Sequence, residues 1–267
     1  MTFPANQRAC IGLTIAGYDP SSGAGITADL AVFAAHGIVG TSAITALTVQ
    51  STLGVQRVQT VAAELLRETL ACLQADLPPQ GIKIGVLADA DTVRVVAEYL
   101  RTVTPRPIVV LDPVLRASSG ADLLTGPGVQ AMLMHLLHVV DVVTPNTVEL
   151  AALTGLACNT DAEIEAAARK LAGRFPKLSV VVTGGHRTVP SDMLLHAGNA
   201  TVFPGERIET AATHGTGCAF SSALLCGLLR GQTMPDAVAA AKSYVATAMR
   251  TAVKVGNGRG PLNLTGR

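Results

Sequence analysis

The strongest indication of chemistry in the sequence is the segment from Ala212 to Leu224, in which a Gly-Thr-Gly turn leads directly into an apolar helical stretch. Amides at such a turn point outward at the start of a helix, so Gly215, Thr216, Gly217 and Cys218 are predicted to form an anion-binding site. A thiol at a helix N-terminus has a lowered pKa, and we expect this for Cys218. The alternative is a tight turn beside a small buried cysteine. The coincidence of two glycines, a threonine and a helix start favours the anion site.

A second glycine-rich segment runs from Ala16 to Asp29, between an expected strand and an expected helix. Glycines at such a place let a ligand approach the backbone, and the start of the helix favours an anion or a polar group. The segment lacks both the Gly-Lys-Ser/Thr end of a Walker motif and the G-x-G-x-x-G spacing of a dinucleotide-binding fold. A long turn in which Asp29 is a solvated carboxylate explains the spacing equally well.

Polar side chains also follow two later strands. Asn146 and Glu149 stand three residues apart after an expected strand at 139–143. Asn146 can cap the next helix while Glu149 bonds back to its amide, which stabilises the helix by about 1 kcal/mol. The same two side chains can instead hold a magnesium ion through water. Asp112, in an Asp-Pro-Val turn, adds a carboxylate at the same edge, although a structural turn is its simpler explanation. Spacing alone favours the cap.

These segments lie between apolar β-rich runs that alternate with amphipathic helical stretches. Strands are expected at 10–16, 38–47, 82–87, 108–111, 139–143 and 178–182, and helices at 26–35, 62–75, 90–102, 128–138, 161–174, 219–229 and 235–253. The alternation predicts a single α/β domain over residues 1–267, with a mostly parallel sheet and helices on both faces. Ligands bind such a sheet at the carboxyl ends of its strands. An edge hairpin is expected at 192–203.

Composition excludes several classes of protein. The chain has 267 residues, of which 49% are hydrophobic, and its 20 Lys and Arg nearly cancel its 19 Asp and Glu. Disorder and nucleic-acid binding are therefore not expected. The 30–56 stretch carries no charge, but its glycines, serines and threonines indicate buried strand instead of a membrane helix. Five scattered cysteines without a C-x-x-C motif indicate free thiols, and we expect a cytoplasmic protein.

Taken together, the motifs resemble the hydroxymethylpyrimidine/phosphomethylpyrimidine kinases of thiamine biosynthesis, members of the ribokinase-like superfamily that also includes pyridoxal kinases. The resemblance covers nearly the whole chain, and the order of its motifs makes it specific. They are Thr14 to Gly17, Ala24 to Leu30, Gly40 to Leu47, Lys83 to Gly85, Asp112 to Val114, Thr144 to Asn146, Gly184-Gly185-His186, Thr213 to Cys218 and Val255 to Pro261.

The resemblance implies a ribokinase-like fold and phosphoryl transfer from ATP to the primary alcohol of 4-amino-5-hydroxymethyl-2-methylpyrimidine. Many members carry out a second transfer onto the monophosphate. The family's pyrimidine-binding positions correspond to Gly17, Asp29, Gln50 and Val86, with Cys218 beside the hydroxymethyl group. A carboxylate and an amide can satisfy the donor and acceptors of an aminopyrimidine. A homodimer is also expected from the resemblance.

For the nucleotide, the resemblance assigns ATP contacts to Asn146, Thr183 and Gly217. Magnesium would be held by Asp112 and Glu149 through water. Phosphoryl transfer is mostly positioning and charge stabilisation, so the amides of the Gly-Thr-Gly turn and the metal would neutralise the transferring group. Cys218 is expected to accept or orient the hydroxymethyl proton.

The chain departs from the family's pattern at three positions. Thr183 stands where the pyrimidine kinases usually have a phosphate-contacting lysine, and pyridoxal kinases more often have a hydroxyl residue there. Tyr18 replaces a small Ser or Thr, and Val86 replaces a common Met. The alternatives are therefore a pyridoxal/pyridoxine kinase, or a catalytically silent pyrimidine-binding protein. Retention of the anion-binding turn and of Cys218 argues against the silent protein.

Overall fold

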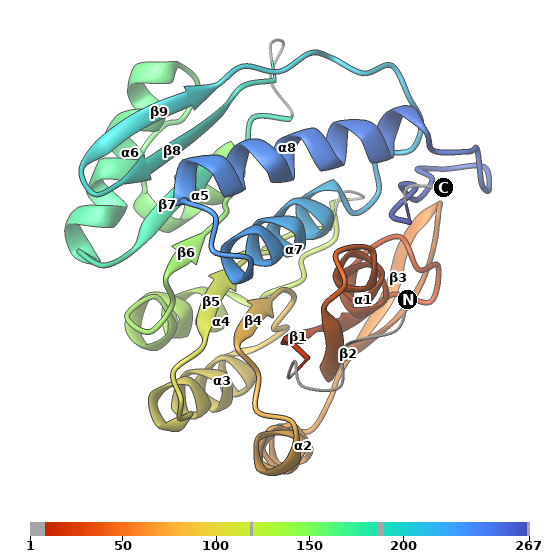
Figure 1. Ribbon diagram of the computed structural model, residues 1–267, viewed down its shortest axis with the longest axis vertical. Helices are drawn as coiled ribbons and strands as arrows, with labels where there is room; N and C mark the ends of the chain where they lie inside the picture. The colour runs from red at the N-terminus through yellow and green to blue at the C-terminus, as the bar shows by residue number, and fades with distance from the viewer. Residues whose placement is uncertain (1–8, 118–119, 186–189, 266–267) are drawn as a thin grey trace.

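The computed structural model describes residues 9–117, 120–185 and 190–265, which build a nine-stranded sheet with helices on both faces (Figure 1). The strands are β1 (Ile11–Tyr18), β2 (Val39–Ser51), β3 (Gly54–Thr60), β4 (Gly81–Ile84), β5 (Ile108–Leu111), β6 (Val142–Val143), β7 (Ser179–Val182), β8 (Asp192–His196) and β9 (Asn199–Phe203). The helices are α1 (Gly25–Ala35), α2 (Ala63–Asp76), α3 (Ala90–Thr102), α4 (Gly126–Ala131) with a π-helical turn (Met132–Leu136), α5 (Thr147–Thr154), α6 (Asp161–Arg174), α7 (Thr216–Leu229) and α8 (Met234–Arg250).

The strand order is β3-β2-β1-β4-β5-β6-β7-β8-β9. The run from β2 to β7 in this order is parallel, whereas β3, β8 and β9 pair antiparallel with their neighbours. The predicted α/β fold with an edge hairpin at 192–203 is therefore confirmed. All carboxyl ends of the parallel strands meet at one edge, where a ligand site is expected.

The sheet divides the hydrophobic core into two layers, because the side chains of each strand point alternately to its two faces. Val109 and Leu111 of β5 face the layer under α2, α3 and α6, whereas Val110 packs in the layer under α1, α7 and α8. Successive side chains of a strand point to opposite faces, so a fully apolar strand such as β5 is buried on both sides. Helices α1 and α7 pack beside each other on one face of the sheet, and this pair positions the candidate site (Figure 1).

Several elements differ from those expected from the sequence; strand β6, for example, is only Val142–Val143 where 139–143 is expected. Helix α7 begins at Thr216, three residues before the apolar run at 219. Strand β3 was not expected, and β2 continues to Ser51 to pair with it. A register shift between Val49 and Gln50 breaks the alternation of this pair, and most of β3 is only partly buried, so the hydrophobic pattern is weak.

Among the described residues, no helix has both the length and the apolar character that crossing a membrane requires.

Candidate active site

A long cleft lies along the carboxyl ends of the parallel strands. Strand order fixes the order of its lining residues, which are Gln50 on β2, Gly17 on β1, Val86 after β4, Asp112 after β5, Asn146 after β6 and Thr183 after β7. The first residues of α7 also line this cleft. The structure therefore brings together side chains from both halves of the chain, as the sequence predicts.

The turn that the sequence predicts to bind an anion lies directly before α7. Gly215 has a left-handed backbone with φ of 79°, and a Cβ at this position would lie 1.9 Å from the carbonyl oxygen of Gly23. Thr216, Gly217 and Cys218 are the first three helical residues, so their amides have no acceptor within the helix. Gly215 provides no side-chain cap for them. These amides are available to an anion in the cleft.

The predicted lowering of the Cys218 pKa is wrong. Burial raises the pKa of the Cys218 thiol to about 12, and the carboxylates of Asp29 and Asp112 act in the same direction. The charge of Lys83 and the nearby backbone of Gly25 oppose this rise without overcoming it. The helix terminus does not compensate because the thiol is only 9% exposed. Cys218 is therefore a neutral thiol near pH 7, suited to orienting a hydroxyl group and not to removing its proton.

Gly17, Val86 and Gln50 form the end of the cleft on the β2 side. A Cβ on Gly17 would lie 3.5 Å from Cβ of Val86, so these two residues face each other. The side-chain amide of Gln50 lies 3.5 Å from Nε2 of His214. This end combines an apolar wall with one amide group, which suits a small heteroaromatic ring.

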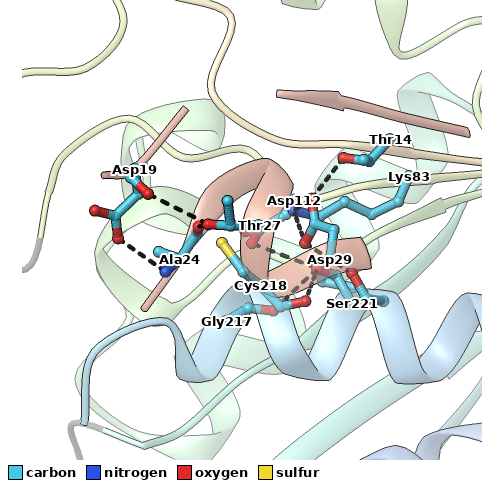
Figure 2. A network of polar contacts seen from close by, with 12 residues as sticks. Thr14, Asp19, Ala24, Thr27, Asp29, Lys83, Asp112, Gly217, Cys218 and Ser221 are labelled. Atoms are coloured by element: carbon cyan, nitrogen blue, oxygen red, sulfur yellow. Dashed lines mark hydrogen bonds and ion pairs between the residues drawn. The ribbon is translucent and has the colours of Figure 1, made fainter. Parts of the chain in front are cut away.

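Asp29 does not line the cleft, and its predicted contact with the pyrimidine is corrected. Its side chain is fully buried and accepts hydrogen bonds from Thr14 Oγ1 at 2.6 Å, Lys83 Nζ at 2.9 Å and Ser222 Oγ at 2.8 Å (Figure 2). Asp29 lies one helical turn after Gly25, on the face of α1 that meets α7. The sequence motif places Asp29 near the site, but the direction of the helix turns its carboxylate away from the ligand.

Asp19 and His214 form a contact that the sequence analysis missed. His214 Nε2 donates to Asp19 Oδ2 at 2.7 Å, and the same carboxylate accepts from the amides of Ser21 at 2.8 Å and Ala24 at 2.9 Å. Burial alone would raise the pKa of Asp19, but the hydrogen bonds from His214, Gln50 and Ser21 hold it well below its usual range. This hydrogen bond joins the first glycine-rich loop to the Gly-Thr-Gly turn. An Asp-Pro pair directly after a strand is the sequence feature that could have indicated it.

Asn146 and Glu149 form the helix cap that their spacing favours. Asn146 Oδ1 accepts from the amides of Val148 and Glu149 at 2.9 Å each, and Glu149 Oε2 accepts from the Asn146 amide at 2.9 Å. The cap leaves both residues in the wall of the cleft. The structural and the ligand-binding interpretations are therefore compatible.

For the buried carboxyl groups of Asp112 and Glu149, the effect of burial exceeds that of the nearby hydrogen bonds and of the Lys83 charge. Burial, followed by the neighbouring Asp112, raises the pKa of Glu149 to about 8. Burial raises the pKa of Asp112 to about 6, although Lys83 opposes it. A cation between them would relieve this unfavourable arrangement. Among the described residues no cluster of three or more His, Cys, Asp or Glu side chains could hold a metal by itself.

The β7 side of the cleft carries Thr183 and Lys242. The Thr183 amide donates to the Pro145 carbonyl at 2.9 Å. Lys242 of α8 lies in the cleft wall and donates to Asp192 Oδ2 at 2.7 Å, a cation that the sequence analysis missed. Asp192 also accepts from the amide of Gly184, next to Thr183. His186, which completes the Gly-Gly-His motif, lies outside the described residues.

Comparison with known proteins identifies the family. Residues 19–263 match the model of the phosphomethylpyrimidine kinase family. The chain belongs to this family. It is 39% identical to the hydroxymethylpyrimidine/phosphomethylpyrimidine kinase of Haemophilus influenzae, covering 94% of this chain and 95% of that protein. It is also 39% identical to the kinase of the same name from Rhizobium meliloti, covering 95% of this chain and 96% of that one.

Solved structures agree with this family and with its ribokinase-like fold. A phosphomethylpyrimidine kinase from Clostridium difficile 630 matches with a TM-score of 0.79 and 30% identity, covering 90% of this chain and 99% of that chain. The ADP complex of a Staphylococcus aureus pyridoxal kinase matches with a TM-score of 0.88 and 26% identity, covering 97% and 95%. The predicted kinase family is confirmed, and pyridoxal kinases share the fold.

Proposed function

We propose that the protein transfers the γ-phosphoryl group of ATP to the hydroxymethyl group of 4-amino-5-hydroxymethyl-2-methylpyrimidine, and then phosphorylates the monophosphate. The observation that carries this proposal is the order of residues along the cleft. A ring-sized end with Gly17, Gln50 and Val86 is followed by Cys218 and the free amides of α7. The names of the relatives support the same reaction.

At the acceptor end, the ring would lie between Gly17 and Val86 while the Gln50 amide bonds to its polar edge. Cys218 would orient the hydroxymethyl oxygen. Because the thiol is neutral, it does not need to accept a proton for this role. A loose phosphoryl-transfer transition state places little demand on a base, so positioning carries most of the catalysis.

At the transfer point, the amides of Gly215, Thr216 and Gly217 would stabilise the charge on the transferring group. Asp112 and Glu149 fit a magnesium ion, because they offer hard oxygen ligands and their carboxylates lie buried near each other. Magnesium bound there would neutralise phosphate charge. One or two carboxylates are enough, since this ion keeps most of its water.

The β7 side of the cleft would take the nucleotide. Its wall includes apolar side chains of Ile208, Val245 and Met249, which suit an adenine ring, beside Thr183 and Asn146. A Staphylococcus aureus pyridoxal kinase with similar architecture was solved in complex with ADP. ATP is therefore the proposed phosphoryl donor. The expected homodimer and the cytoplasmic location stay predictions.

A coupled ADP-release assay tests the function directly. The purified protein is given ATP and magnesium with the pyrimidine alcohol, its monophosphate, or pyridoxine. We expect turnover with the first two and a kcat/KM for the pyrimidine alcohol at least about tenfold above that for pyridoxine. A preference for pyridoxine would establish the alternative that the hydroxyl residue Thr183 suggests. No ADP release with any alcohol would indicate a silent binding protein.

Replacing Gln50 by leucine is expected to raise the KM for the pyrimidine alcohol by about ten- to hundredfold. The substrate's polar edge would be left unpaired, which costs ~1–3 kcal/mol. Initial rates at varied pyrimidine and saturating ATP measure this change. Gln59→Leu is the control, because Gln59 lies on the adjacent β3 with an exposed side chain outside the cleft. An unchanged KM in Gln50→Leu would remove Gln50 from the substrate site.

Replacing Glu149 by glutamine is expected to raise the magnesium concentration for half-maximal rate several-fold, with little change in melting temperature. Glutamine keeps an oxygen for the Asn146 backbone amide, and it removes the carboxylate charge together with the long hydrogen bond from the Leu115 amide at 3.4 Å. Below a pKa of about 8 the buried Glu149 is largely neutral without metal, so its stability resembles that of glutamine.

The matched control for Glu149→Gln is Glu163→Gln in α6. Thr160 and Glu163 form the same capping box there, and Glu163 is partly exposed outside the cleft. Magnesium titrations of the two variants distinguish the effect of losing a carboxylate charge at the cleft from the effect of altering a helix cap. A large melting loss in Glu149→Gln with a normal magnesium response would limit Glu149 to its capping role.

A further inference from the structure

Helices α1 and α7 meet at two contacts that repeat at the same spacing on both helices. The backbone of Gly25 lies beside the Cys218 thiol, and Ser222 Oγ donates a hydrogen bond to Asp29 Oδ1 at 2.8 Å. Gly25 and Asp29 are four residues apart on α1, and Cys218 and Ser222 are four residues apart on α7. Residues at this spacing share one face of a helix, so the two contacts lie one turn apart on facing surfaces.

Asp29 is fixed on its other side to the sheet. Thr14 Oγ1 of β1 donates to Oδ2 at 2.6 Å, and Lys83 Nζ of β4 lies 2.9 Å from both carboxylate oxygens. Figure 2 shows Asp29 between these two side chains and the start of α7. Asp29, Lys83, Thr14 and Ser222 are all fully buried. Strands β1 and β4 lead to Gly17 and Val86, which form the proposed ring site.

Packing does little to position the first turn of α7 at this contact, although Phe220, Leu224 and Leu225 pack in the core further along the helix. The residues that α7 presents near Asp29 and Asp112 are small, namely Gly217, Cys218, Ser221 and Ser222, and small side chains interlock little. Directional hydrogen bonds to a buried carboxylate supply the missing constraint. A small rotation of α7 would move the Cys218 sulfur and the three free amides together, away from the acceptor.

We propose that Asp29 is a positioning residue for phosphoryl transfer, which fixes the rotation of α7 through Ser222 and thereby the direction of Cys218 and of the anion-binding amides. Lys83, whose Nζ lies 2.9 Å from both carboxylate oxygens, holds the Asp29 carboxylate in place relative to the ring site, and Thr14 only adds a hydrogen bond that stabilises the buried carboxylate. This inference rests on the proposed function, because it assigns the reacting groups to the two sides of this contact. In this role Asp29 acts through its contact with α7 and does not contact the substrate.

The matched variants Ser222→Ala and Thr14→Val test this role. Each removes one hydroxyl that donates to Asp29, and each position is fully buried, so both should lower the melting temperature by similar amounts. Only Ser222 connects Asp29 to α7. We expect kcat to fall about tenfold in Ser222→Ala with the KM for the pyrimidine alcohol within about twofold, because small misplacements of reacting groups reduce rate strongly. Thr14→Val should keep kcat within about twofold of the unmodified protein.

Equal kcat losses in the two variants, or none in either, would overturn the proposal, since a purely stabilising network does not distinguish them. If Ser222→Ala does not accumulate as folded protein, Ser222→Cys provides the comparison with a weaker donor of similar size. Failure of the proposed function is separable. It would appear as absence of turnover of the pyrimidine alcohol by the unmodified protein, and the variants would then be compared on whichever alcohol is phosphorylated.

Discussion

Replacing Gly215 by alanine is expected to lower kcat by at least about 10²-fold, the largest effect predicted for this site. The added Cβ would lie 1.9 Å from the Gly23 carbonyl oxygen, so either the turn or the first glycine-rich loop must move. The left-handed backbone at φ of 79° adds strain for any residue with a side chain. Both effects displace the amides that would stabilise the transferring phosphoryl group.

The control for this prediction is Gly231→Ala, just after the C-terminus of α7. Gly231 has nearly the same left-handed backbone, with φ of 80°, but no atom lies within 4 Å of its ideal Cβ. The two variants thus share the backbone strain and differ in the clash at the cleft. Steady-state rates and circular dichroism melts compare them. A folded Gly215→Ala protein with kcat close to that of Gly231→Ala would exclude the turn from catalysis.

Much of the fold could be predicted because buried parallel strands and amphipathic helices leave strong periodic patterns. Strands such as β5 are apolar at every residue, and α3 presents a clear apolar face. Strand β3 was missed for a physical reason. None of its residues is fully buried, and a register shift breaks the alternation of its pairing with β2. Hydrophobic patterns report burial, and they fail where a strand has little of it.

The candidate site was predicted less completely, because spacing places residues near an edge without giving their directions. Gly17, Gln50, Val86 and the turn at 215–218 all line the cleft. Asp29 belongs to the same motif as Gly25, but it lies one helical turn further along α1, outside the cleft, where it accepts a hydrogen bond from Ser222 of α7. Asp19 and His214 lie 195 positions apart in the sequence, and no local sequence pattern predicts a contact over such a separation.

The pKa of Cys218 illustrates a competition that sequence cannot decide. A helix N-terminus lowers a thiol pKa, whereas burial raises it. Which effect prevails depends on how completely neighbouring segments cover the sulfur. Here α1 and β4 bring Gly25, Asp29 and Lys83 close to it, and burial prevails. The prediction for this residue therefore changes from a base to an orienting group.

Cys218→Ala is expected to lower kcat by about ten- to hundredfold, because the hydroxymethyl group loses a hydrogen-bonding partner worth ~1–3 kcal/mol in the closed site. The pH dependence of kcat should keep its shape between pH 6 and about 9, because a thiol with a pKa of about 12 stays protonated throughout this range.

Cys226→Ala is the matched control, since Cys226 is buried on the same helix, its pKa is also raised to about 12, and it lies outside the cleft. It should lose stability and keep kcat. The measurements are kcat, KM, melting temperature and the pH profile of each variant. A step in the profile of the unmodified protein that disappears in Cys218→Ser would show that Cys218 acts as a thiolate base, and kcat within about twofold in Cys218→Ala would limit the thiol to packing.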